Sequence, residues 1–148
     1  MKKILFVCLG NICRSPIAHG IAQYLSTQNN LSLYIDSAGT SGFHKGESPH
    51  HKSIWVSNKY GIDITKQKSR PLNEDDKEFD YVIAMDDANI KDLSHMGFEH
   101  IIKLGDYGLN GADIIDPYYL PGDEGFEKVF SDVNIALEEF FKKEFDLT

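Results

Sequence analysis

The sequence contains little cysteine and no long apolar run. Its two cysteines, Cys8 and Cys13, are too few for the disulfide framework of a small secreted domain. The apolar segment "ILFVCLG" near the N-terminus is far shorter than the roughly 20 residues of a membrane-spanning helix. No signal-peptide cleavage pattern follows it. We therefore expect a cytoplasmic protein, although export by a non-classical route leaves no mark that this reasoning would detect.

An excess of basic residues is also lacking. The chain has 15 Lys and Arg against 23 Asp and Glu, which gives a formal net charge of −8. Nucleic acids and anionic membranes require a basic face, so we expect the protein to bind neither. A small site can still be locally positive and bind an anion. The 148 residues show no internal repeat and suit one domain, residues 1–148, acting as a monomer or a weak homo-oligomer.

Strand-like and helix-like segments alternate along the chain. The apolar patterns predict strands over residues 2–8, 31–39, 79–86 and 100–107, and helices over 15–25, 50–60, 87–96 and 126–142. This alternation is typical of an α/β fold with a parallel sheet covered on both faces. Ligands of such folds bind beyond the carboxyl ends of the strands. Four polar residues fall near those ends: Cys8, Ser37, Asp86 and Asp106.

The segment between the first strand and the first helix has the features of an anion site. It reads Cys8-Leu9-Gly10-Asn11-Ile12-Cys13-Arg14-Ser15, and we call it the phosphate loop (residues 8–15). Its length allows successive backbone N–H groups to surround one tetrahedral anion, and the helix that follows adds its own free N–H groups and its positive dipole end. Gly10 gives the backbone freedom at the tight point. The planar fork of Arg14 matches two phosphate oxygens.

Cys8 lies where such an anion would bind. Cysteines at helix N-termini and near arginine form thiolates readily, and a thiolate facing phosphate is a nucleophile for phosphorus. Ser15 can donate its hydroxyl to that thiolate, and Asn11 can hold the loop by bonding backbone groups across it. The alternative is an ordinary strand–turn–helix with a buried cysteine and a surface arginine.

The segment "CLGNICRSP" resembles the signature of low molecular weight protein tyrosine phosphatases, and "IDSAGT", "FDYVIAMDDANIKDL" and "DPYY" are similar to later parts of that family. The resemblance implies a flavodoxin-like three-layer sandwich with a four-stranded parallel sheet in the order 2-1-3-4. It implies hydrolysis of phosphotyrosine in a partner protein through a phosphocysteine on Cys8, without metal or cofactor. The phosphate-binding residues would be Leu9, Gly10, Asn11, Ile12, Cys13, Arg14 and Ser15.

A carboxyl group should protonate the leaving oxygen and later activate water. The resemblance assigns this role to Asp116, which also lies in a Gly/Pro-rich loop of the kind that often presents catalytic groups. Charge alone leaves four other carboxylates open: Asp86, Asp87, Asp106 and Asp113. The substrate walls that we expect are Ile12, Phe43, Tyr118 and Tyr119. Tyr119 could instead pack the loop onto the sheet, and Phe43 could be a core or merely exposed residue.

The resemblance also assigns supporting roles. It implies that Ser37 supports Asn11 and that Cys13 can form a reversible disulfide with Cys8, although a strand-end serine and a small buried cysteine are the plainer interpretations. Gln67 lies where the family often has a histidine that braces the loop, and His50 replaces a family aspartate. The adjacent His50 and His51 are poorly spaced for a shared metal ion.

Three other functions fit parts of the pattern. A protein-arginine phosphatase of the same family would carry Thr where Ile12 stands and would lack the aromatic pair after Asp-Pro. An arsenate reductase needs further cysteines, and none follows Cys13. A catalytically dead phosphate-binding module would not need Cys8, Arg14 and Asp116 together, and all three are present.

Overall fold

The computed structural model describes residues 1–147 and contains a four-stranded parallel sheet in the order β2-β1-β3-β4. This is the predicted order. The strands are β1 (Lys2–Cys8), β2 (Leu33–Gly39), β3 (Tyr81–Ala84) and β4 (Ile101–Lys103). The helices are α1 (Arg14–Gln28), α2 (His51–Lys59), α3 (Asp87–His95) and α4 (Glu124–Phe145), with short 3-10 turns over Glu74–Glu78, Leu104–Asp106 and Pro117–Tyr119.

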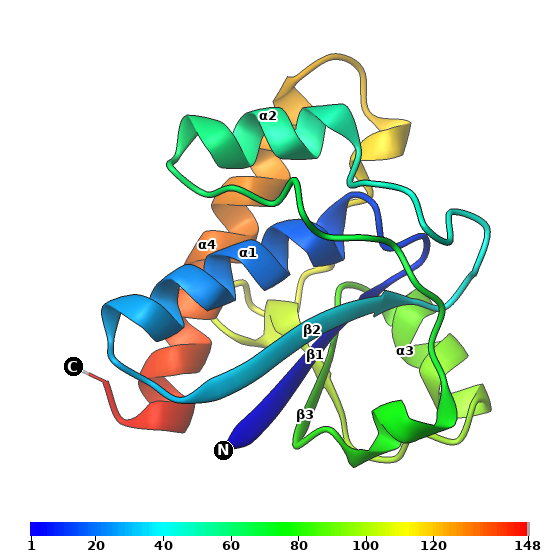
Figure 1. Cartoon of the computed structure of the whole chain (residues 1–148), viewed down its shortest axis with the longest axis vertical. Coiled ribbons are helices and arrows are strands. Elements are labelled where there is room, and N and C mark those ends of the chain that lie inside the picture. Colours follow the sequence, from blue (N-terminus) through cyan, green and yellow to red (C-terminus); the bar gives the residue numbers. More distant parts are fainter. Residues whose placement is uncertain (148) are drawn as a thin grey trace.

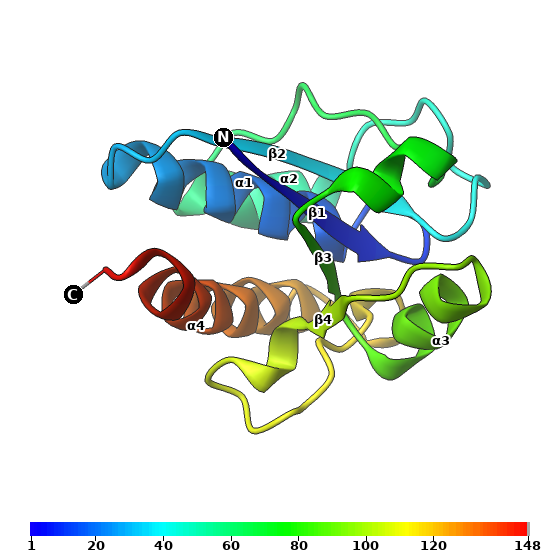
Figure 2. The same ribbon diagram turned by 90° about the horizontal axis from the view of Figure 1, so that it is seen from below.

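Helices cover both faces of the sheet. Figure 1 shows α1, α2 and α4 on one side and α3 on the other, and Figure 2 shows α1 and α4 lying side by side. Alternation along β1 produces this arrangement, because successive side chains point to opposite faces. Ile4 and Phe6 belong to the core beneath α1 and α4, whereas Leu5 and Val7 pack with Leu93 of α3.

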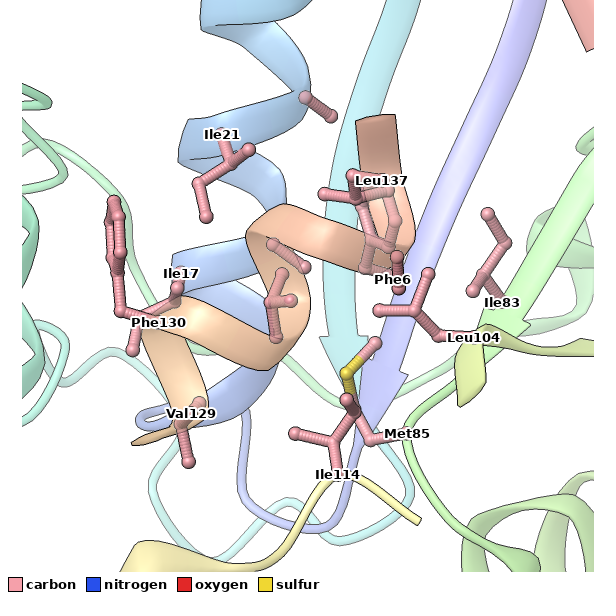
Figure 3. Close-up of a cluster of buried hydrophobic side chains, with 14 of the residues drawn as sticks. Phe6, Ile17, Ile21, Ile83, Met85, Leu104, Ile114, Val129, Phe130 and Leu137 are labelled. Atoms are coloured by element: carbon pink, nitrogen blue, oxygen red, sulfur yellow. The ribbon is translucent and has the colours of Figure 1, made fainter. Parts of the chain in front are cut away.

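The larger core cluster reaches the carboxyl end of the sheet. Figure 3 shows Phe6, Ile83 and Leu104 beside Leu137, with Met85 and Ile114 at the end where the strands finish. The backbone N–H of Ile114 donates to the carbonyl of Met85 at 2.8 Å. The long segment that carries Asp116 is therefore joined to the core just beyond β3. We call residues 107–123, between the turn after β4 and α4, the acid loop.

The fourth strand and the last helix differ most from their predicted ranges. The fourth strand ends at Lys103, because the chain turns at Leu104–Asp106 to bring Gly105 against the acid loop. A Cβ atom on Gly105 would lie 1.6 Å from the carbonyl oxygen of Ala112, so that approach requires glycine. The last helix runs from Glu124 to Phe145 and is longer at both ends than the predicted 126–142. Within residues 1–147, none of the helices combines the length and apolar character that a membrane crossing needs.

Candidate functional site

The phosphate loop is held from outside by its carbonyl groups. Five of these carbonyl oxygens accept hydrogen bonds from other segments. Three accept from backbone N–H groups: Cys8 from Thr40 (3.0 Å), Leu9 from Ser41 (2.9 Å) and Ile12 from His50 (2.7 Å). Two accept from serine hydroxyls: Gly10 from Ser69 (2.9 Å) and Cys13 from Ser53 (3.3 Å). In a trans peptide the N–H points opposite to the C=O. Outward-facing carbonyls therefore turn the following N–H groups toward the inside of the loop. The N–H groups of residues 9 to 13 donate no hydrogen bond to any other part of residues 1–147.

A chain of hydrogen bonds leads from the loop to the Cys8 sulfur. The backbone N–H of Arg70 donates to Asn11 Oδ1 (3.1 Å), and Asn11 Nδ2 donates to Ser15 Oγ (2.7 Å). Ser15 Oγ lies 3.1 Å from Cys8 Sγ. Asn11 has a φ of +56°, in the left-handed region that asparagine tolerates better than most residues. The side chain of Asn11 thus joins the middle of the loop to its helical end.

Arg14 is a buried cation in the first turn of α1. Its side chain is 3% exposed, and Nη1 donates to Asp86 Oδ2 (2.6 Å) and to the carbonyl of Ile114 (3.0 Å). Burial alone lowers the pKa of the guanidinium, but the negative charges of Cys8, Asp86 and Asp116 outweigh burial and raise the pKa above its ordinary value. Arg14 therefore stays charged beside the phosphate loop.

Asp116 faces the same region from the acid loop. Its Oδ1 accepts the backbone N–H of Tyr118 (3.0 Å) and so caps the short turn Pro117–Tyr119. Its Oδ2 lies 3.8 Å from Arg14 Nη2, and the side chain is 24% exposed. Pro117 fixes the chain direction after the carboxylate. The carboxylate thus has one oxygen held by its own loop and the other turned toward Arg14.

A cavity of about 350 Å³ joins these groups. It is lined by Cys8, Leu9, Gly10, Ile12, Cys13, Arg14, Ser41, Phe43, His44, Asp116, Tyr118 and Tyr119. Its lining combines the Cys8 sulfur and the Arg14 guanidinium with the rings of Phe43, Tyr118 and Tyr119. Phe43 is 84% exposed and Tyr118 is 76% exposed, so both rings remain free to contact a bound group. Within residues 1–147, no cluster of three or more His, Cys, Asp or Glu could hold a metal ion.

Comparisons with known proteins fit this geometry. Residues 3–146 match the model of the low molecular weight phosphotyrosine protein phosphatase family. The chain belongs to this family. It is 40% identical to the low molecular weight protein-tyrosine-phosphatase YfkJ of Bacillus subtilis, with 94% of this chain and 93% of the relative covered. The crystal structure of Primo-1 superposes with a TM-score of 0.92 at 34% identity, covering 98% of this chain and 99% of the other. A drosophila arginine phosphatase superposes with a TM-score of 0.89 at 33% identity, and each chain is 97% covered.

The phosphatase brings most of the predicted site residues together. Cys8, Arg14 and Asp116 line one cavity, together with the predicted walls Ile12, Phe43, Tyr118 and Tyr119. Both cysteines are buried free thiols in the same cavity lining. The reversible disulfide between Cys8 and Cys13 stays a prediction.

The prediction that Ser37 supports Asn11 was wrong, because the side chains of these two residues bond other partners in this phosphatase. The hydroxyl of Ser37 lies 3.2 Å from His19 Nδ1 in α1. Alternation along β2 places Ser37 on the face that also carries Ile35, beneath α1. Asn11 takes its partners from Arg70 and Ser15 instead.

The two departures from the family pattern have different outcomes. Gln67 does not brace the phosphate loop, since its amide donates to the carbonyl of Pro16 in α1 at 3.1 Å. Ser69 and Arg70 contact the loop instead. His50 supports the loop through its backbone N–H, while its ring caps α2 by accepting from the N–H of Lys52. The ring also stacks on Phe126, with centroids 5.0 Å apart.

Sequence reasoning missed several residues that shape the site. Asp86 holds Arg14 with one oxygen and caps α3 with the other, which accepts the N–H of Asn89 at 2.7 Å. Asp86 was noted at the end of the predicted strand 79–86 and among the candidate carboxylates, but its contact with Arg14 was not predicted. His44 lines the cavity and lies 2.9 Å from Glu47, and no motif in the loop after β2 identified it. Lys103 also escaped notice.

Proposed function

We propose that this phosphatase hydrolyses phosphotyrosine in proteins, and small aryl phosphates, through a phosphocysteine on Cys8. One observation carries the proposal: a sulfur nucleophile, a permanently charged guanidinium and a carboxyl group line the same 350 Å³ cavity. The inward-facing N–H groups of the phosphate loop add donors for phosphate oxygens. These groups can perform the proposed chemistry without a cofactor.

The first step transfers the phosphoryl group to Cys8. The thiolate attacks phosphorus, an S–P bond forms, and the P–O bond to tyrosine breaks. Asp116 in its protonated form gives its proton to the leaving oxygen, so tyrosine departs neutral. Arg14 and the loop N–H groups stabilise the charge on the three remaining phosphate oxygens.

The second step returns the enzyme to its starting state. Asp116, now ionised, takes a proton from a water molecule while the oxygen of that water attacks phosphorus. The S–P bond breaks, inorganic phosphate leaves, and Cys8 regains its thiolate. The Ser15 hydroxyl, 3.1 Å from the sulfur, stabilises the thiolate when it forms. The protons balance over the two steps, because Asp116 is protonated both before the first step and after the second.

The walls of the cavity favour an aryl group over a guanidinium group as the leaving group. Ile12 offers an apolar surface inside the phosphate loop, and Phe43 and Tyr118 offer rings at the rim. The similarity to a drosophila arginine phosphatase makes phosphoarginine the second candidate substrate. A hydroxyl in place of Ile12 would suit the polar guanidinium better, and this chain has none at that position.

The test compares phosphotyrosyl peptide, phosphoarginine and nitrophenyl phosphate as substrates. We expect the highest kcat/KM on the phosphotyrosyl peptide. Cys8→Ser should bind inorganic phosphate without turnover. Asp116→Asn should lower kcat on the phosphotyrosyl peptide by about 10²-fold or more, because a general acid contributes typically 10²–10⁴-fold. Preference for phosphoarginine would replace the proposed substrate, and turnover by Cys8→Ser would refute the phosphocysteine.

A further inference from the structure

Lys103 is a partly buried cation outside the cavity. It is the last residue of β4, at the carboxyl end of the sheet, and its side chain is only 12% exposed. Its Nζ lies 2.8 Å from Asp113 Oδ1 in the acid loop and 2.9 Å from Asp87 Oδ1 at the start of α3. The backbone N–H of Asp87 also donates to Asp113 Oδ1, at 3.2 Å. Asp113 is thus held three residues before Asp116.

Lys103 and Arg14 hold the acid loop in parallel. Asp86 and Asp87 are adjacent at the start of α3, and they bind Arg14 and Lys103 respectively. Arg14 then binds the carbonyl of Ile114, and Lys103 binds the side chain of Asp113. Two neighbouring carboxylates therefore hold two cations, which in turn hold two neighbouring residues of the acid loop.

From this arrangement we propose that Lys103 is a positioning residue for Asp116. By fixing Asp113 against β4 and α3, it sets the path of the acid loop so that the Asp116 carboxyl meets the leaving oxygen. The inference rests on the proposed function, because it requires Asp116 to act as the general acid. A displacement of about 1 Å in such a group is enough to lower the rate strongly.

The charges support this role. The hydrogen bonds that Lys103 donates to Asp113 and Asp87 raise the pKa of Lys103 to about 12, and the bond that Asp113 accepts from Lys103 lowers the pKa of Asp113. Lys103 and Asp113 are therefore both charged at neutral pH. Asp113 can be fixed by Lys103 without either group entering the cavity, since neither lines it.

The experiment uses the leaving group as its readout. Nitrophenol leaves easily without a proton, whereas phenol requires one, so a misplaced acid affects phenyl phosphate more than nitrophenyl phosphate. For Lys103→Met we expect kcat/KM on phenyl phosphate to fall about 10-fold further than on nitrophenyl phosphate. Lys103→Arg, which keeps the charge, should restore the ratio toward the wild-type value. Inhibition by inorganic phosphate should be unchanged.

The matched control is Lys77→Met, which removes another lysine from an ion pair, with Glu74 at 2.7 Å, outside the acid loop. It should leave the ratio of the two substrates unchanged. If Lys103→Met fails to fold, Asp113→Asn removes the negative charge from the same contact with little change of shape and should shift the ratio in the same direction. Equal losses on both substrates in the folded variants would overturn the positioning role.

Asp116→Asn separates the inference from the proposed function. It should show the same leaving-group dependence more strongly, and Lys103→Met in the Asp116→Asn background should cause no further selective loss. If Asp116→Asn shows no leaving-group dependence, the assignment of the general acid fails. If Asp116→Asn shows the leaving-group dependence but Lys103→Met and Asp113→Asn do not, Asp116 remains the general acid and the positioning role of Lys103 is refuted.

Discussion

The hydroxyl of Ser15 lies 3.1 Å from the sulfur of Cys8, with both side chains buried. The amide of Asn11 donates to the same hydroxyl oxygen at 2.7 Å. Because that amide occupies a lone pair of the oxygen, the hydroxyl hydrogen is free to point at the sulfur. Ser15 is therefore arranged to donate to Cys8, and the donation is strongest when the sulfur carries a negative charge.

Ser15→Ala tests this donation. A hydrogen bond to a charged group contributes about 1.5–3 kcal/mol. We therefore expect kcat on nitrophenyl phosphate to fall by about 10- to 100-fold, since 1.36 kcal/mol corresponds to tenfold. Steady-state kinetics measure the change. Ser26→Ala is the control, because Ser26 is a buried serine of α1 that donates to the carbonyl of Leu31, away from the cavity. Turnover of Ser15→Ala within twofold of the wild type would contradict the role.

Cys13 should resist alkylation at neutral pH. Burial and the neighbouring charges of Cys8 and Asp116 raise the pKa of its thiol to about 12. The thiolate is the reactive form, so almost no Cys13 is reactive at pH 7. We expect iodoacetate to label Cys8 and to leave Cys13 unmodified, as measured by mass spectrometry of the labelled peptides. Rapid labelling of Cys13 in the Cys8→Ser variant would show that this thiol ionises far more easily.

The phosphate loop could be predicted from sequence because its parts are consecutive. A strand, a cysteine, a glycine, an arginine and a helix start all occur between residues 2 and 16, so local patterns specify their relative positions. The contacts that hold the loop come from distant segments. Ser69 binds the carbonyl of Gly10 from 59 residues away, and Asp86 binds Arg14 from 72 residues away. Only the sheet topology brings these residues together.

Two errors show where the sequence pattern was insufficient. The family resemblance implied that Ser37 supports Asn11. Ser37 is two residues from Ile35 in β2, so its side chain lies on the same face of the sheet, toward α1. Lys103 ends a strand that seemed to continue to residue 107. The strand stops because the acid loop packs against Gly105, and that contact depends on Ala112, which no local pattern connects to β4.

His19 should make the stability of the phosphatase depend on pH. Burial lowers the pKa of His19 below its ordinary value of 6.5, although the charge of Asp36 partly opposes this. The unfolded chain therefore binds a proton at His19 as the pH falls below about 6.5 while the folded chain does not, so stability is lost as the pH falls. We expect His19→Gln to lose less stability than the wild type between pH 7.5 and pH 5.5.

Urea midpoints at the two pH values measure this difference. His50 contributes in the same direction, since burial also lowers its pKa, and it is present in both proteins. The comparison of wild type with His19→Gln therefore isolates His19. Identical changes of the midpoint in the two proteins would show that His19 titrates alike in the folded and unfolded chain.

Gly39 should tolerate no larger residue, because it lies against the backbone of the phosphate loop. A Cβ atom there would lie 2.7 Å from the carbonyl oxygen of Leu9 and 2.9 Å from that of Ser41. The backbone of Gly39 cannot move away easily, because its N–H donates to the carbonyl of Arg70 and its C=O accepts from the N–H of Leu72. Overpacking of this kind costs about 1–3 kcal/mol. We expect Gly39→Ala to lower the urea midpoint and to weaken inhibition by inorganic phosphate, because moving Leu9 turns the loop N–H groups out of place.

Gly42→Ala is the matched control for that substitution. Gly42 lies three residues further along, and a Cβ atom there would meet only the Pro71 side chain, at 3.4 Å, which is ordinary contact. Neither glycine has a positive φ, so backbone conformation affects the two variants alike. We expect Gly42→Ala to keep the phosphate affinity and to match or exceed the wild-type midpoint, since alanine restricts the unfolded chain. Equal effects of the two substitutions on phosphate inhibition would show that the approach of β2 to Leu9 does not set the shape of the phosphate loop.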